Sequence, residues 1–248
     1  MTFLIVCPLC LLAGILNASG GSGGLISLPA MLIAGLPPHL AIGTNKLQAV
    51  MGMGVANVRF IKSKLLDFKL AAISICFAVG GASIGSQLSL LCDETALKYI
   101  MVGILPIAAF FVLNRKLFEK ERSDDLASTR RTYIAVCASA FLIGIYDGFY
   151  GPGTGTFLII AFMVFGELSV RRASAQAKAV NFATNLTALL VFLVNGEVNI
   201  WLGLAAGACN MIGAWLGAGL VIDFGAKVMR PAIAVALVLM VLKVFGVY

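Results

Sequence analysis

The chain has 248 residues, of which 60% are hydrophobic and 12% are charged, and its mean hydropathy is +1.02. Soluble globular domains carry about 25% charged residues, so this composition excludes that class and predicts an all-α polytopic membrane protein. The formal net charge of +7 does not indicate a nucleic-acid partner, because the cations lie mostly at the ends of apolar stretches and no basic patch is interleaved with aromatic residues.

Five apolar stretches follow one another in the first half, and most approach the ~20 residues that a helix needs to cross a bilayer. They cover residues 3–19, 24–36, 40–58, 70–92 and 96–114. No positive residue precedes the first stretch, so we interpret it as retained structure rather than a secretory signal. The second stretch has about thirteen residues, which at ~1.5 Å per residue are too few to cross.

The second half repeats this order, with apolar stretches at 132–149, 153–165, 173–194, 200–222 and 231–248. From residue 21 to residue 88, the chain aligned with itself at a shift of 132 positions gives thirteen identities without a gap. The identical pairs are Gly21 and Gly153, Gly23 and Gly155, Met31 and Met163, Leu36 and Leu168, Ala41 and Ala173, Lys46 and Lys178, Ala56 and Ala188, Phe60 and Phe192, Leu70 and Leu202, Gly81 and Gly213, Ala82 and Ala214, Gly85 and Gly217, and Leu88 and Leu220. We therefore predict an internal duplication with about 8–10 membrane segments, in which repeats 1–114 and 132–248 flank a linker at 115–131.

Charged loops predict that the two repeats have opposite orientations. The cytoplasmic ends of membrane helices are rich in Lys and Arg. The loop after the third stretch is cationic in the first repeat (59–69), but its equivalent in the second repeat (195–199) has no cation. The linker is also cationic and is expected to be cytoplasmic. Inverted repeats of this kind are typical of secondary transporters, which bind substrate where the repeats meet.

A glycine cluster precedes the short apolar stretch in each repeat: Gly20–Gly24 in the first and Gly151–Gly155 in the second. Such residues disfavour a helix, so we predict a broken or re-entrant element whose tip lies inside the protein, where free N–H groups favour an anion. The alternative is close helix packing by small residues, which applies better to Gly81 with Gly85 and Gly213 with Gly217. The substrate-binding candidates from the clusters are Gly21, Ser22, Gly23, Gly153, Thr154 and Gly155.

Lys46 and Lys178 lie in the third stretch of their repeats, each among polar residues. A lysine within a membrane segment is costly and by default faces a cavity or a partner. The alternative is that both snorkel to the interface. Their polar neighbours complete the candidate substrate site: Thr44, Asn45 and Gln48 in the first repeat, and Gln176, Asn181 and Asn185 in the second.

Asp147 is the one carboxylate within an otherwise apolar or aromatic run, directly before the second glycine cluster. A two-residue change of offset aligns it with Asn17. An acid inside a membrane protein is a candidate proton-coupling group. The open alternative is structural pairing with Lys178 or with backbone N–H groups.

No catalytic or metal-binding pattern accompanies these residues. The six cysteines lack metal-ligand or disulfide spacing, and the motif Cys7-Pro8-Leu9-Cys10 lies in an apolar segment, where packing is favoured over redox chemistry. The single histidine, His39, lies in a Pro-Pro turn. We expect no cofactor, no metal and no enzymatic activity.

Three stretches together carry a family resemblance: Gly14 to Pro29, Gly43 to Lys46, and Tyr146 to Thr156 with the string Asp-Gly-Phe-x-Gly-Pro-Gly-Thr-Gly. With these motifs the chain resembles the sulfite exporter TauE/SafE family of membrane transporters over essentially its whole length. The resemblance implies a polytopic inner-membrane permease for small anions, among them sulfite, sulfoacetate and other sulfur-containing or organic anions. Ser22 departs from the pattern, which would have a further glycine.

We therefore predict a secondary transporter that moves a small anion across the cell (inner) membrane by alternating access, with Asp147 coupling transport to protons. An anion channel is the alternative within transport, and an intramembrane enzyme is a weaker one. The expected partners are the small anionic substrate and the lipid bilayer, and a homo-oligomer is left open.

Overall fold

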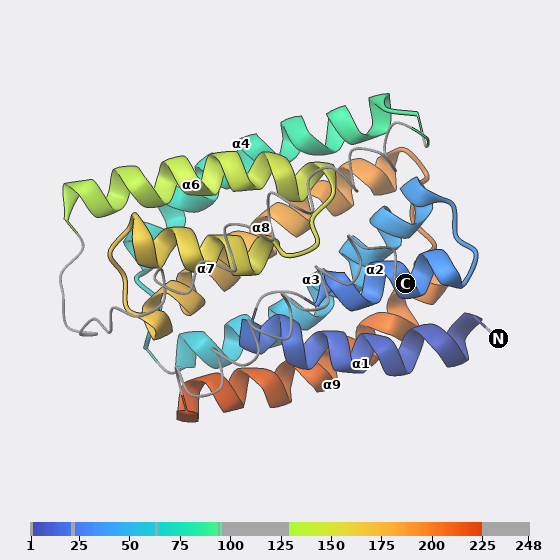
Figure 1. The fold of residues 1–248 in the computed structure, drawn as a ribbon, viewed down its shortest axis with the longest axis horizontal. Coiled ribbons are helices and arrows are strands. Elements are labelled where there is room, and N and C mark those ends of the chain that lie inside the picture. Colours follow the sequence, from blue (N-terminus) through green and yellow to red (C-terminus); the bar gives the residue numbers. More distant parts are fainter. Residues whose placement is uncertain (1, 21–22, 63, 94, 96–128, 225–248) are drawn as a thin grey trace.

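The computed structural model describes residues 2–20, 23–62, 64–93, 95 and 129–224, and in these ranges it contains helices and no strand (Figure 1). The helices are α1 (Thr2–Gly20), α2 (Gly24–Ile33), α3 (Pro38–Lys62), α4 (Phe68–Leu91), α6 (Arg130–Phe149), α7 (Thr154–Val164), α8 (Val170–Val194) and α9 (Ile200–Phe224). The all-helical prediction is confirmed for these residues. The predicted stretches 96–114 and 231–248, and residues 115–128 of the linker, lie outside the described residues.

Four helices, α4, α6, α8 and α9, are long and apolar enough to cross a membrane. Helices α2 and α7 have 10 and 11 residues, too few to cross. The apolar part of α1 covers Thr2–Ala18, whereas α3 has 25 residues and buries several polar side chains. Length and composition thus support four spans in the described part of the chain, and the total of eight to ten stays a prediction.

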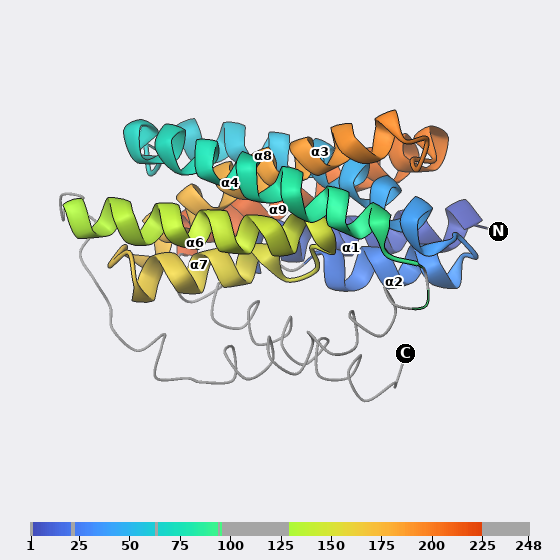
Figure 2. The same cartoon turned by 90° about the horizontal axis from the view of Figure 1, so that it is seen from above.

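The polar helices α3 and α8 lie in the middle of the bundle, between the pair α4 and α6 and the pair α1 and α9 (Figures 1 and 2). Helices α3 and α8 run in opposite directions. This orientation follows from a hydrogen bond that Asn57, near the end of α3, donates to the backbone carbonyl oxygen of Lys178, near the start of α8. Their buried faces carry ten of the 21 buried polar or charged side chains of the described residues, among them both buried lysines. The interior is therefore polar in the middle and apolar toward the outer helices.

Small residues let the outer helices approach closely. A Cβ added to Gly81 on α4 would lie 3.0 Å from the backbone nitrogen of Ile145 on α6, and one added to Gly213 on α9 would lie 3.0 Å from that of Ile15 on α1. Both distances leave no room for a side chain. The prediction that these glycines serve close helix packing is confirmed.

Helices α6 and α7 form a hairpin: α6 runs from one end of the bundle toward its middle, and α7 returns to the same end (Figure 1). Helices α1 and α2 form a second hairpin from the opposite end, and residues of both meet in one apolar cluster. The connections are residues 21–23 and 150–153. Gly151 and Gly153 have φ values of +100° and +86°, the left-handed region that glycine adopts at no steric cost.

The surface cations gather at one end of the bundle. Apart from the buried Lys46 and Lys178, the Lys and Arg residues of the described chain lie near the end of α3 or the starts of α4, α6 and α8. These positions adjoin one another, since Arg172 on α8 lies 3.7 Å from Asp67 before α4. The opposite end, at the turns before α3 and α9, has no described Lys or Arg.

Candidate functional site

A buried ion pair joins the middle helix α3 to the end of α6. Lys46 Nζ lies 3.0 Å from Asp147 Oδ1 and donates a 2.5 Å hydrogen bond to the backbone carbonyl oxygen of Asp147. Both side chains are 1% exposed. A charge at this depth requires a partner, because desolvation costs several kcal/mol per ion. Lys46 therefore does not snorkel to the interface.

Donors surround the Asp147 carboxylate. Its Oδ1 accepts hydrogen bonds from Lys46 and from Thr154 Oγ1, the latter at 2.9 Å. Its Oδ2 accepts from Thr184 Oγ1 and from Asn185 Nδ2, the latter at 2.8 Å. These donors come from α3, α7 and α8, so this one carboxylate ties three helices to α6.

Lys178 on α8 is fully buried but has no carboxylate partner within the described chain. Its Nζ donates to the backbone carbonyl oxygen of Asn17, near the end of α1. This contact mirrors the bond from Lys46 to the backbone of Asp147. The predicted alternatives of snorkelling for Lys178 and of pairing between Asp147 and Lys178 are wrong: both lysines are buried, and the acid pairs with Lys46.

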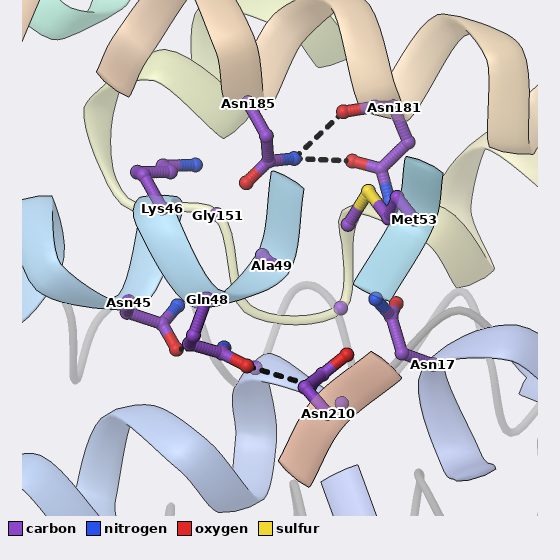
Figure 3. A pocket seen from close by; sticks show the side chains of 13 residues that line it. Asn17, Asn45, Lys46, Gln48, Ala49, Met53, Gly151, Asn181, Asn185 and Asn210 are labelled. Atoms are coloured by element: carbon purple, nitrogen blue, oxygen red, sulfur yellow. Dashed lines mark hydrogen bonds between the residues drawn. The ribbon is translucent and has the colours of Figure 1, made fainter. Parts of the chain in front are cut away.

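A small polar cavity lies where α1, α3, α8, α9 and both glycine-rich connections meet (Figure 3). Its volume is about 20 Å³, slightly more than the ~10–15 Å³ that one water molecule requires. The lining residues are Asn17, Gly23, Gly24, Asn45, Lys46, Gln48, Ala49, Met53, Gly151, Gly153, Asn181, Asn185 and Asn210. The sole charged side chain among them is Lys46.

The amide side chains around the cavity are partly bonded to one another. Asn45 Oδ1 accepts from Gln48 Nε2 at 2.8 Å, and Asn181 Oδ1 accepts from Asn185 Nδ2 at 2.8 Å. These bonds use the oxygens of Asn45 and Asn181 and leave their Nδ2 groups without a partner among the described residues. The side chain of Asn17 also makes no hydrogen bond there. Three amides, each at most 6% exposed, thus present unused N–H donors at the cavity.

Gly151 lies against the ion pair, and the starts of α2 and α7 reach the cavity at Gly23 and Gly153. A Cβ on Gly151 would lie 2.5 Å from Lys46 Nζ and 2.8 Å from Asp147 Oδ1, so this position has room for glycine alone. Gly23 and Gly153 are the N-cap residues of α2 and α7, and neither helix start is capped by a side chain. Unbonded N–H groups at a helix start carry partial positive charge.

Five predicted substrate-binding residues are described but do not line the cavity, and neither does the proton-coupling candidate Asp147. Thr44 Oγ1 accepts from the backbone N–H of Asn199 at 2.9 Å, and Gln176 Nε2 donates to the carbonyl oxygen of Asp67 at 2.9 Å. Each contact holds the start of an outer helix, α9 for Thr44 and α4 for Gln176. The other three are Thr154, which bonds Asp147, Gly155 in the first turn of α7, and Lys178, which contacts the lining residue Asn17. Gly21 and Ser22 lie outside the described residues.

Asn17 and Asn210 line the cavity, although sequence reasoning did not place them in the site. Asn210 Nδ2 donates to Gln48 Oε1 at 2.6 Å, and its own oxygen has no partner among the described residues. The available signal was a single amide in the apolar helix α9. The internal repeat could not reveal it, because the equivalent position is Ala78.

The remaining motif residues lie elsewhere. His39 Nε2 is 3.1 Å from the carbonyl oxygen of Ser89, at the end of the bundle that lacks cations. Cys7 and Cys10 are free, and Cys10 is buried in an apolar cluster with Val6 and Leu28. Among the described residues no group of His, Cys, Asp or Glu could hold a metal ion.

A bundle of long apolar helices around a charged, amide-lined centre is typical of an integral membrane protein. The family model for the sulfite exporter TauE/SafE matches residues 6–244, and the chain therefore belongs to that family.

Relatives from several bacteria carry transporter names. The chain is 34% identical over 241 residues to the "Probable membrane transporter protein YfcA" of Escherichia coli K12, covering 94% of this chain and 86% of the relative. It is 32% identical over 232 residues to a "Probable membrane transporter protein" of Haemophilus influenzae, covering 93% and 89%. No solved structure matches the chain. The predictions of the family, and of a membrane transporter rather than an enzyme, are confirmed.

Proposed function

We propose that this protein is a secondary transporter for a small oxyanion, such as sulfite, a sulfonate or another organic anion, in the cell (inner) membrane. The observation that carries the proposal is the central cavity, where unused N–H donors of Asn17, Asn45 and Asn181 lie near two buried lysines. Among the described residues only one of these lysines, Lys46, pairs with a carboxylate. Oxyanions accept several hydrogen bonds, and those from charged donors are the strongest. The cationic end of the bundle would face the cytoplasm.

Mirrored contacts support two inverted repeats. Helices α3 and α8 both have 25 residues, and their bounds differ by the 132 positions of the sequence repeat. Lys46 bonds the backbone of Asp147, and Lys178 bonds that of Asn17. Helix α4 packs on α6 as α9 packs on α1. In this interpretation α2 and α7 are the short arms of broken elements that do not cross the membrane, and their starts at Gly23 and Gly153 reach the cavity.

The size of the cavity favours alternating access over a channel. A space of about 20 Å³ accommodates a water molecule but not an anion with four or more heavy atoms. The oxyanion would therefore enter only when one hairpin moves, and the present conformation would be closed to both sides. A channel would instead need a continuous polar path.

Proton coupling is assigned to Asp147. Protonation of its carboxylate would remove the counter-ion of Lys46, which lies 3.0 Å away and lines the cavity. Lys46 would then be released to contact an anion that already lies in the cavity, so that proton and anion move together. This sequence of events links transport to the proton gradient without any further titrating group.

The test is uptake of radiolabelled sulfite into liposomes that contain the purified protein, with thiosulfate, sulfate and a sulfonate as competitors. We expect saturable, competed uptake by the wild type and its loss in Lys178→Ala. Removal of Lys46 alone would leave Asp147 buried and unpaired, so the matched variant is Lys46→Met with Asp147→Asn, in which uptake should no longer respond to a pH gradient. Unsaturable uptake at channel rates would refute the transporter. Wild-type uptake in both folded variants would refute the site.

A further inference from the structure

The buried charges of the described chain do not balance. The fully buried ionisable residues with formal charge are Lys46, Lys178 and Asp147. Lys46 and Asp147 form an ion pair, which leaves the positive charge of Lys178 without a protein counter-ion among the described residues. The other charged side chains lie at helix ends, where water or headgroups can solvate them.

The imbalance arises at one position. Near the end of α6 an aspartate offers both its backbone carbonyl and its carboxylate to Lys46. Near the end of α1 the corresponding residue is Asn17, which offers its backbone carbonyl to Lys178 in the same way. The geometry around Lys46 shows that a carboxylate at such a position reaches the lysine, because Nζ lies 3.0 Å from Oδ1. An amide there leaves the second lysine unneutralised.

Asn17 also lines the cavity, where its side chain has no hydrogen-bond partner among the described residues. Because its backbone carbonyl oxygen also contacts Lys178, Asn17 lies between the cavity and this lysine. A buried charge without a partner is strongly destabilising, and a ligand of opposite charge offsets that cost. In a medium of low dielectric constant such an attraction acts over several ångströms, so Lys178 need not touch the ligand.

We propose that, while Lys46 and Asp147 form their ion pair, Asn17 makes this cavity a site for monovalent anions, because it leaves Lys178 as the single positive charge that the substrate neutralises. The inference rests on the proposed function and adds to it the charge of the substrate and the residue that sets it. A sulfonate, hydrogensulfite or a small carboxylate fulfils the requirement. Sulfate would leave one negative charge buried in the protein, and a neutral molecule would leave the positive one.

The first experiment introduces the missing acid as Asn17→Asp. The new carboxylate should pair with Lys178 as Asp147 pairs with Lys46, so the protein should remain folded with an unchanged or raised unfolding temperature. Uptake of radiolabelled methanesulfonate into liposomes should fall at least tenfold. Asn17→Ala removes one amide donor without adding charge and should weaken uptake by a few fold. Asn195→Asp adds a carboxylate at the exposed end of α8 and should leave uptake unchanged.

The second experiment uses the wild type alone and does not depend on the folding of any variant. Methanesulfonate and sulfate compete for uptake of radiolabelled methanesulfonate at neutral pH, where the first is a monoanion and the second a dianion. We expect half-inhibition by sulfate only at concentrations at least tenfold higher.

The outcomes separate the two proposals. Absence of uptake of every anion by the wild type would overturn the proposed function. Saturable wild-type uptake that persists in folded Asn17→Asp, or that sulfate inhibits as well as methanesulfonate, would overturn the monoanion rule alone.

Discussion

The ion pair between Lys46 and Asp147 permits a quantitative test. Asp147→Asn keeps the size of the side chain but leaves the ammonium of Lys46 buried at 1% exposure without its carboxylate. Removing one partner of a buried pair costs about 3–5 kcal/mol. For a chain of 150–250 residues each kcal/mol shifts the unfolding temperature by roughly 2–4 °C, so the variant should unfold roughly 6–20 °C below the wild type.

The matched double variant, Lys46→Met with Asp147→Asn, removes both charges. Replacement of a whole buried pair by uncharged groups of similar size is often neutral or stabilising, so the double variant should recover most of the loss. The assay is thermal unfolding of purified protein in one detergent, followed by intrinsic fluorescence or by loss of the monodisperse peak. Wild-type stability of Asp147→Asn, or equal losses in the single and double variants, would refute the pairing energetics.

Three further predictions test the geometry around this pair. Gly151→Ala should lower both the unfolding temperature and uptake, because its Cβ would lie 2.5 Å from Lys46 Nζ. The control Gly196→Ala meets no atom within 4 Å and should cost only the ~1–2 kcal/mol of a left-handed backbone conformation. Equal effects of the two substitutions would contradict a steric clash at Gly151. In a cysteine-free background, Lys64→Cys and Gly196→Cys should be labelled by an impermeant maleimide from opposite sides of the membrane, and labelling from the same side would disprove the inverted repeats. Gln176→Ala should lower the free energy of unfolding by about 1 kcal/mol, the value of one lost hydrogen bond, and leave the KM for uptake unchanged. An altered KM would show that Gln176 belongs to the substrate site.

The sequence predicted the helices well, because the long apolar stretches and the internal repeat indicate the same segments. The stretch predicted at 40–58 is α3 at Pro38–Lys62, and the one at 173–194 is α8 at Val170–Val194. Helices α3 and α8 are longer than the predicted apolar stretches, because the polar residues at their ends also adopt helical turns. The short helices after the glycine clusters also occur where expected, as α2 and α7.

Which polar residues meet at the cavity was less predictable. Neighbours of Lys46 in sequence include Thr44 and Gln48, yet only Gln48 lines the cavity, because Thr44 lies on another face of α3 and bonds the start of α9. The choice of Lys46 over Lys178 as the partner of Asp147 depends on how the end of α6 is packed relative to α3 and α8. That packing is a long-range feature, and no spacing within one segment encodes it.

The contacts of Gly81 and Gly213 place backbone against backbone in the outer helix pairs. No side chain separates the two helices at these glycines, so α4 with α6 and α1 with α9 should each move as a stiff pair. Any shape change must then be absorbed where side chains of different helices meet through polar bonds, chiefly Lys46 with Asp147 and Lys178 with Asn17. The groups that would recognise the substrate thus also hold the two outer helix pairs to α3 and α8.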